Sequence, residues 1–127
     1  MAKVIIRKPE LDFVLNNPEG MVGKYLAKKG RQLEVLAKAQ VGVRTGALRA
    51  SIHMRHMRDS RRQYVMVGSR LNYALMHHEG TKPHLIVADK AKVLRFVKGS
   101  SIVYAHSVMH PGTKANRYLS DNLRKVL

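Results

Sequence analysis

The longest periodic pattern of apolar positions in the chain runs from Pro18 to about Ala39. Apolar residues recur there at three- and four-residue spacing, at Val22, Tyr25, Leu26, Leu33, Leu36 and Ala37. This spacing predicts an amphipathic helix, and the lysines and arginines between these positions predict a basic solvent face. Pro18 and Glu19 suit the first turn. Gly30 costs about 1 kcal/mol relative to alanine inside a helix, which indicates close packing or a kink.

Residues 1–17 precede this helix and are interpreted as an N-terminal arm. The stretch AKVIIRK is expected to be extended, Pro9 opens a short helical turn, and Asn16, Asn17 and Pro18 close it. Residues 18–127 are expected to form a single domain, because their number suits one hydrophobic core.

The pattern changes from helical spacing to alternation after Gly46. Alternation predicts a strand from about Leu48 to Met57, a turn at RDSRR and a returning strand at QYVMVGS, which together form an antiparallel hairpin. Seven arginines and one acid, Asp59, lie between Arg44 and Arg70. The tip of this hairpin is therefore expected to be the most positive place in the chain.

The second half of the chain predicts another hairpin and a terminal helix. NYALMHHEG fits either a strand or a short helix, and the preferred interpretation is one or two helical turns that end at Gly80. Pro83 starts a loop. VLRFV and SIVYAHSV, joined by a Lys-Gly-Ser-Ser turn, predict the clearest hairpin, and RYLSDNLRKVL predicts a closing helix. The expected fold class is α+β: a small antiparallel sheet of two hairpins, with a long N-terminal helix and a C-terminal helix packed on it.

Charge narrows the choice of partners. Lysine and arginine number 24 against 8 acidic residues, a net charge of +16. Such a charge favours nucleic acid, acidic protein surfaces or anionic membranes. Aromatic residues make up only 6% of the chain, so the stacking pattern of single-strand binders is absent. No apolar run approaches the roughly 18–20 residues that span a bilayer, and no membrane partner is expected.

The sequence contains few residues in arrangements that suit metal binding or catalysis. The chain has no cysteine, which excludes disulfides and thiolate metal sites. His77, His78 and Glu79 lie together, but adjacent histidines point in different directions and no HExxH spacing occurs. No acid pair or nucleophile motif is present. We therefore expect no enzyme activity, no catalytic or metal-binding residue and no cofactor, and interpret the histidines as polar residues at a surface or subunit interface.

Two similar turns raise the alternative of phosphate binding. HEGTKPHL begins at His78 and HPGTKANRYL begins at His110, and both contain Gly-Thr-Lys. Neither matches the GxxxxGK(S/T) pattern of a phosphate-binding loop. The preferred interpretation is structural, because glycine allows a tight or left-handed turn and threonine bonds to the local backbone. The expected structural turn residues are Gly46, Gly80, Thr81, Gly112 and Thr113.

Taken in order, these pieces resemble a known family. RTGALRASI, YVMVGS, NYALMHHEGTKPHLI and AKVLRFVKGSSIVYAHSVMHPGTKANRYL are similar to the tail-component and head–tail joining family of long-tailed bacteriophages, often named after gene product ten of phage HK ninety-seven. The resemblance covers about residues 20–127. Two departures are the ending ANRYL, where Pro-Phe-Leu is common, and the N-terminal arm, which lies outside the pattern. The matching positions are Thr45, Gly46, Leu48, Arg49, Ser51, Tyr73, Ala74, Glu79, Gly80, Thr81, Pro111, Gly112 and Thr113.

The resemblance implies a non-enzymatic virion protein that is made in the host cytoplasm. Its copies would form a ring at the head–tail junction, as a neck, tail-completion or tail-terminator protein, with sixfold symmetry expected first and twelvefold second. Its neighbours would be other neck, portal-side and tail-tube proteins, with non-specific contact to genomic DNA in the channel as a further role for the charge. The expected interface or channel residues are the hairpin arginines Arg55, Arg58, Arg61 and Arg62.

A second function from another class stays open. A basic nucleic-acid-binding protein of the cytoplasm would share the charge, although it would explain none of the ordered motifs. Salt-dependent binding of the isolated monomer to duplex DNA would favour this alternative.

Overall fold

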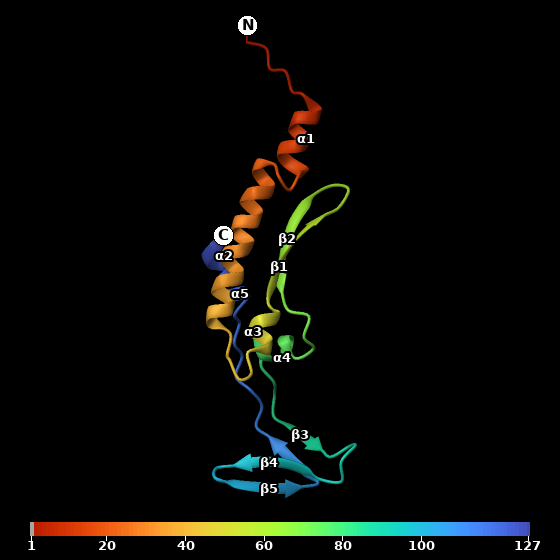
Figure 1. Cartoon of the computed structure of the whole chain (residues 1–127), viewed down its shortest axis with the longest axis vertical. Coiled ribbons are helices and arrows are strands. Elements are labelled where there is room, and N and C mark those ends of the chain that lie inside the picture. The colour runs from red at the N-terminus through yellow and green to blue at the C-terminus, as the bar shows by residue number, and fades with distance from the viewer. Residues whose placement is uncertain (1) are drawn as a thin grey trace.

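The computed structural model describes residues 2–127 and shows an elongated molecule (Figure 1). Met1, the first residue of the predicted arm, lies outside the described residues. The helices are α1 (Lys8–Asn16), α2 (Met21–Gln40), α3 (Ala47–Ser51), α4 (Ala74–Glu79) and α5 (Ser120–Val126). The strands are β1 (His53–Arg58), β2 (Gln63–Gly68), β3 (His84–Val87), β4 (Leu94–Lys98), β5 (Ser101–Ala105) and β6 (Ser107–His110). The predicted α+β class is confirmed, including the long helix near the N-terminus and the helix at the C-terminus.

The strands form three antiparallel pairs, β1–β2, β3–β6 and β4–β5. The pairs β1–β2 and β4–β5 are the two predicted hairpins. They do not join into one sheet, because the third pair, β3–β6, carries the second hairpin away from the first. Within residues 2–127, no helix is long and apolar enough to cross a membrane.

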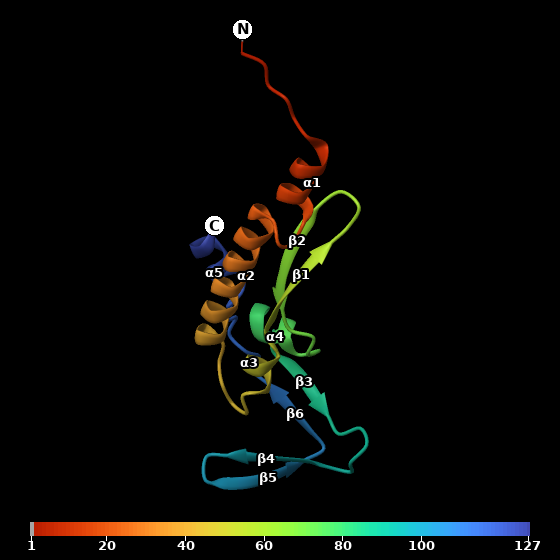
Figure 2. The same cartoon turned by 45° about the horizontal axis from the view of Figure 1, so that its top comes forward.

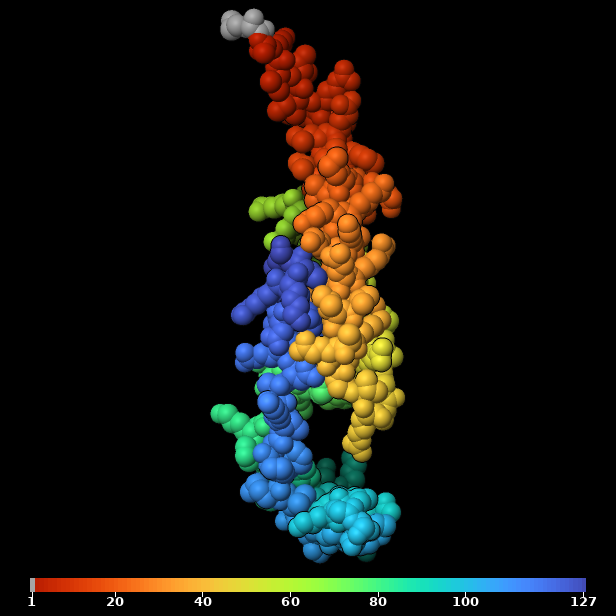
Figure 3. Space-filling view, turned by 90° about the vertical axis from the view of Figure 1, so that its left-hand side faces the viewer, coloured from red at the N-terminus to blue at the C-terminus, as the bar shows by residue number. Residues whose placement is uncertain are grey.

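The molecule has a central body and a projection at each end (Figure 2). The body contains α2, α5, the β1–β2 hairpin, α3 and α4. The N-terminal segment and α1 extend from one end, beside the tip of the β1–β2 hairpin. Residues 83–111, which we call the β-arm, extend from the other end, and open space separates the β-arm from the loop after α2 in Figure 3.

The hydrophobic core is small and lies near the middle of the body. It joins the C-terminal end of α2 to α3, α4 and the start of α5, through Ala37, Val41, Leu48, Ile52, Ala74 and Tyr118. Asn122 is also buried, and its amide nitrogen donates to the carbonyl oxygen of Tyr118 and to Oε1 of Gln40, both at 2.8 Å. These bonds satisfy a buried polar group while they hold α5 against α2.

Helix α2 begins at Met21, slightly later than predicted, and continues to Gln40. Its buried residues include Leu33 and Ala37, which lie one turn apart on one face. Gly30 lies where α2 crosses the first hairpin, and a Cβ atom there would lie 2.7 Å from Cγ of Met54. Close packing, rather than a kink, therefore explains this glycine.

The predicted strand from Leu48 to Met57 is wrong in its first half. Ala47–Ser51 forms the short helix α3, and the strand begins only at His53. Leu48 and Ile52 are four residues apart, so one helical turn directs both side chains into the core, where they are buried. Alternation alone could not distinguish this spacing from a strand.

The predicted loop after Pro83 is also wrong, because His84–Val87 forms β3. Its partner β6 comes from the end of the run SIVYAHSV, which was predicted as one strand. That run breaks at His106, whose carbonyl oxygen accepts a hydrogen bond from the Ala88 N–H at 2.9 Å. β5 therefore pairs with β4, and β6 turns away to pair with β3.

Part of the predicted arm is held against the body. The amide of Gln63 donates to the carbonyl oxygen of Leu15, near the end of α1, at 2.6 Å. The Oε1 atom of the same buried side chain lies 2.8 Å from Nε2 of His56. Gln63 therefore holds α1 beside the hairpin, and residues 2–7 extend beyond α1.

Candidate functional site

The two Gly-Thr turns, separated in sequence, meet in space. The Thr81 N–H donates to the carbonyl oxygen of Thr113 at 3.1 Å, and the Thr113 N–H donates back to Thr81 at 3.0 Å. The two hydroxyl oxygens lie 3.0 Å apart. The β3–β6 ladder follows directly, beginning with the pair His84 and His110. The turns therefore form the junction between the body and the β-arm.

Glycine is required on both sides of this junction. Gly80 and Gly112 have φ angles of +76° and +85°, in the region that side chains disfavour. A Cβ atom at Gly80 would lie 2.6 Å from the carbonyl oxygen of Thr113, and one at Gly112 would lie 2.9 Å from the carbonyl carbon of Lys82. The backbones approach too closely for any side chain at either position.

The amides of these turns are engaged with protein atoms. The N–H groups of Thr81 and Thr113 bond to each other's carbonyl groups, and the Gly112 N–H donates to Nδ1 of His110 at 3.0 Å. Phosphate binding by a backbone loop needs N–H groups that point at the ligand. The geometry of the turns therefore supports a structural role.

Gly46 differs from the other two turn glycines. Its φ angle is +83°, but within residues 2–127 no atom beyond Gly46 and its two neighbours in the sequence lies within 4 Å of the position that a Cβ would take. Its carbonyl oxygen accepts a hydrogen bond from the Ala50 N–H at 2.9 Å, which starts α3. The backbone angle alone, without any close approach, favours glycine here.

The histidines considered as metal ligands form hydrogen bonds within the protein. His78 Nδ1 lies 2.6 Å from Oε1 of Glu79, and its Nε2 accepts from the Ser120 N–H at 3.4 Å. His77 Nε2 accepts from the Gly42 N–H at 3.3 Å. Both rings lie against Tyr118, and burial raises the pKa of the Tyr118 hydroxyl. In residues 2–127, no cluster of three or more His, Cys, Asp or Glu side chains is arranged to hold a metal ion.

The four candidate arginines lie on the first hairpin, and all are exposed. Arg55 and Arg58 belong to β1, and Arg61 and Arg62 to the turn. Asp59 organises that turn, because its Oδ1 accepts the N–H groups of Arg61 and Arg62 at 2.8 and 2.9 Å. These two bonds hold the pKa of Asp59 below its usual value. The turn is thus folded around one carboxylate, with arginines projecting outward.

Arg62 has an acidic partner in the part of the chain that the structure describes. Its Nε lies 3.4 Å from Oδ2 of Asp59, and its guanidinium lies 5.6 Å from the centre of the Tyr64 ring. Within the described chain, Arg55, Arg58 and Arg61 form no salt bridge. Three cations near one end of the molecule are therefore open to an acidic partner.

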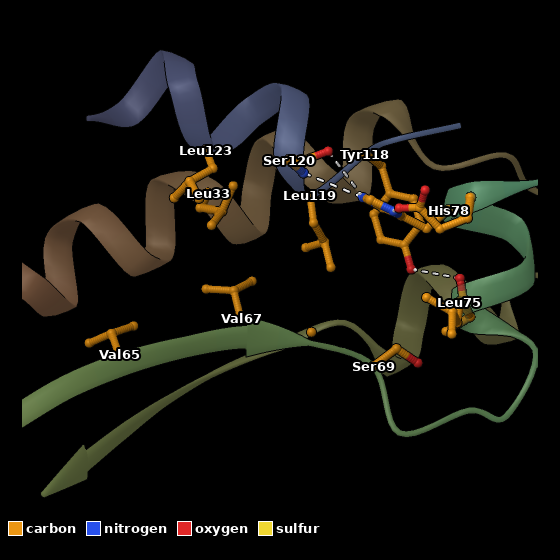
Figure 4. A pocket seen from close by; sticks show the side chains of 13 residues that line it. Leu33, Val65, Val67, Ser69, Leu75, His78, Tyr118, Leu119, Ser120 and Leu123 are labelled. Atoms are coloured by element: carbon orange, nitrogen blue, oxygen red, sulfur yellow. Dashed lines mark hydrogen bonds and ion pairs between the residues drawn. The ribbon is translucent and has the colours of Figure 1, made fainter. Parts of the chain in front are cut away.

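An apolar groove, which sequence reasoning missed, lies between β2 and α5 (Figure 4). Its volume is about 580 Å³. Leu123 of α5 and Leu119, the residue before α5, reach into it, and Val67 faces them from β2. Leu33 of α2 and Val65 complete the apolar lining, while Ser69, Leu75 and His78 lie toward one end. The closing helix was predicted to pack on the sheet, and no pattern in the sequence indicated a groove beside it.

The accessible surface of the chain is far larger than a compact monomer needs. It measures 10463 Å², whereas a compact protein of 14.4 kDa is expected to expose about 6,800 Å². Both projections carry exposed apolar side chains. The most exposed apolar residues of the N-terminal segment are Val4, Ile5 and Ile6, and those of the β-arm are Leu85, Val87, Val97, Ile102, Tyr104 and Met109.

Comparisons with protein-family models, with curated proteins and with solved structures gave no match. The resemblance to the tail-component family therefore rests on the ordered motifs of the sequence alone.

Proposed function

We propose that the protein is a non-enzymatic structural subunit of a long-tailed bacteriophage, whose copies form a ring at the head–tail junction. The surface excess is the observation that carries the proposal. Roughly 3,600 Å² beyond the compact expectation is more than the ~1,600 Å² that one subunit contributes to two standard interfaces. A chain with this surface gains its missing burial from other subunits.

The two unlike projections suit a ring. A closed ring is built from head-to-tail contacts, in which each subunit presents two different surfaces to its two neighbours. This chain has uncovered apolar side chains on an N-terminal projection at one end and on the β-arm at the other. Sixfold symmetry is the first expectation and twelvefold the second.

The β4–β5 hairpin of the β-arm carries apolar side chains on both of its faces. In the β4–β5 ladder, Phe96 faces Val103 on one side, and Val97 faces Ile102 on the other. Strands that are apolar on both faces are typical of sheets covered on both sides, and an isolated two-stranded hairpin is at best marginally stable. The β-arm therefore has the composition of an element buried by neighbouring subunits.

The arginine tip supplies a contact of a different kind. Arg55, Arg58 and Arg61 have no acidic partner within residues 2–127, and arginine pairs with carboxylates in a fixed geometry. We assign the tip to an acidic face of a neighbouring neck, portal-side or tail-tube protein. Genomic DNA in the channel is the other polyanion that these arginines could face.

A free nucleic-acid-binding protein would account for the charge but would not need the exposed apolar side chains on the two projections. The two functions differ in what the purified protein does. Native mass spectrometry at physiological salt, with negative-stain images of the same sample, should show a closed ring. A stable monomer that binds duplex DNA with a steep salt dependence would instead support the alternative.

A further inference from the structure

The body of the molecule has two adjacent helices but only two strands beneath them. Asn122 ties α5 to α2 along their shared side. Helices packed side by side lie about 8–10 Å apart, and paired strands lie about 4.8 Å apart. Two such helices therefore cover about four strands. α2 lies over the β1–β2 hairpin, whereas Leu123 of α5 and Leu119, which directly precedes α5, overhang the groove beyond Val67.

The edge of β2 that borders this groove is unpaired. Asp59 and Arg62 form a hydrogen-bonded pair at the tip, and antiparallel pairs alternate, so the backbone groups of Val65 and Val67 point away from β1. Met54 of β1 lies opposite Val67 in the same kind of pair, so its backbone should also point away from the partner strand. It does, because the Met54 N–H donates to Oε2 of Glu34 at 2.8 Å. Within residues 2–127, no hydrogen bond outside the ladder involves the backbone of Val65 or Val67.

The same chain carries an extended segment whose apolar side chains are largely exposed. Residues 2–7 form no helix or strand, and the side chains of Val4, Ile5 and Ile6 are 85%, 71% and 69% exposed. Three successive β-branched residues favour a strand. The segment points along the long axis away from its own groove (Figure 1). Six residues span about 20 Å when extended, the same length as the six-residue strand β2.

We propose that residues 2–7 of a neighbouring copy add to the open edge of β2 as a third strand. Val4 and Ile6 then enter the groove against Leu119 and Leu123, and Ile5 lies beside Met66 on the opposite face of the sheet. Main-chain hydrogen bonds hold such an added strand, and alternate side chains determine its specificity. Each copy donates one segment and receives one, which is the head-to-tail arrangement that closes a ring. The inference rests on the proposed function for the presence of neighbouring copies.

Crosslinking of single-cysteine variants tests this contact, because the chain has no cysteine of its own. Ile5→Cys protein is mixed with Met66→Cys protein, allowed to exchange subunits, and treated with a short bismaleimide. Opposite and diagonal positions on adjacent strands lie within about 8 Å. Met57→Cys is the matched control, since Met57 lies on the same face but one strand further away, about 10 Å or more from the added strand. Ring formation by the unmodified protein is measured in parallel.

The expected result is a crosslinked pair of chains from Ile5→Cys with Met66→Cys, and little or none with Met57→Cys. A ring without that crosslink, or with equal crosslinking to both methionine positions, overturns the inference and leaves the proposed function standing. Crosslinking of Met66→Cys to Ile102→Cys instead places the neighbour's β-arm, and not its N-terminal segment, beside β2, and also overturns the inference. Selective crosslinking at Met66 in a sample that forms no ring supports the exchange of strands between copies but contradicts the proposed ring. If neither the crosslink nor a ring is found, the strand exchange and the proposed function are both contradicted.

Discussion

A single Cβ atom at position 112 would collide with the turn that faces it. Gly112→Ala and Gly46→Ala place alanine at nearly equal φ angles, +85° and +83°, but only Gly112 has backbone atoms close by. Both changes should lower the free energy of unfolding by about 1–2 kcal/mol for the left-handed angle. Gly112→Ala should lower it further, because the junction must move apart.

Urea unfolding at one fixed protein concentration measures this difference. Gly80→Ala should behave like Gly112→Ala, since the Gly80 position meets the carbonyl oxygen of Thr113. Equal losses at positions 46, 80 and 112 would contradict the close approach of the two turns.

The Glu34 carboxylate links α2 to β1. Its carboxylate accepts hydrogen bonds from Nζ of Lys38 at 2.6 Å and from the Met54 N–H at 2.8 Å. The Lys38 bond, together with the Met54 bond, lowers the pKa of Glu34. A lowered pKa means that the ionised carboxylate stabilises the fold above the unfolded-state pKa, and that this stability is lost as the pH falls toward the folded-state pKa.

Glu34→Gln should therefore lower the free energy of unfolding at pH 7 by about 1–3 kcal/mol. The difference from the unmodified protein should shrink as the pH falls below about 4, where the carboxyl group itself becomes protonated. Glu10→Gln is the control, because its ion pair with Arg7 is exposed and should be worth less than about 1 kcal/mol. A gap that is constant between pH 7 and pH 3 would refute the role of the charge.

At the scale of elements, Gln63 determines where α1 lies. Gln63→Ala removes the donor to the Leu15 carbonyl oxygen and the partner of His56. We expect faster amide hydrogen exchange in α1, with α2 unchanged, because α1 has no buried residue of its own. Gln32→Ala, on the exposed face of α2, should leave exchange in α1 unaltered. Unchanged α1 protection in Gln63→Ala would show that another contact holds the helix.

The elements that the sequence predicted correctly are those with long or local patterns. α2 has five turns of periodic apolar residues, and the β1–β2 and β4–β5 hairpins pair across short turns. β3 was missed because its four residues become a strand only by pairing with β6, about twenty residues later. α3 was missed because Leu48 and Ile52 fit both a helix and a strand.

Some features of the candidate site could be predicted from local sequence patterns, and others could not. The turn glycines and the hairpin arginines could be predicted from the sequence, because the Gly-Thr repeat and the cluster of arginines are local sequence patterns. The meeting of the two turns, and the groove between β2 and α5, could not be found. Both depend on segments far apart in the sequence, and the groove exists because α5 lies beside α2 without a strand beneath it.

At the scale of the whole molecule, the arginine tip is expected to act in assembly. Replacing Arg58, Arg61 and Arg62 by Ser should leave the subunit folded, because all three side chains are exposed. It should weaken binding to an acidic neighbour and give separate full heads and free tails. The control replaces Lys24, Lys28 and Arg31, on the exposed side of α2, which removes the same charge elsewhere.

Counting joined and separate particles by electron microscopy distinguishes the outcomes. Equal defects in both triple variants would show that total charge matters and the tip does not. Normal joining with slowed DNA ejection from the hairpin variant would place the arginines on the channel instead.

Electron cryomicroscopy of assembled particles tests the central claim most directly. The account predicts a closed ring of this chain between the DNA-filled head and the tail, with six copies expected first and twelve second. Each copy should contact its neighbours through the two projections. Particles that lack the protein, with all of it recovered as a soluble monomer, would contradict the account.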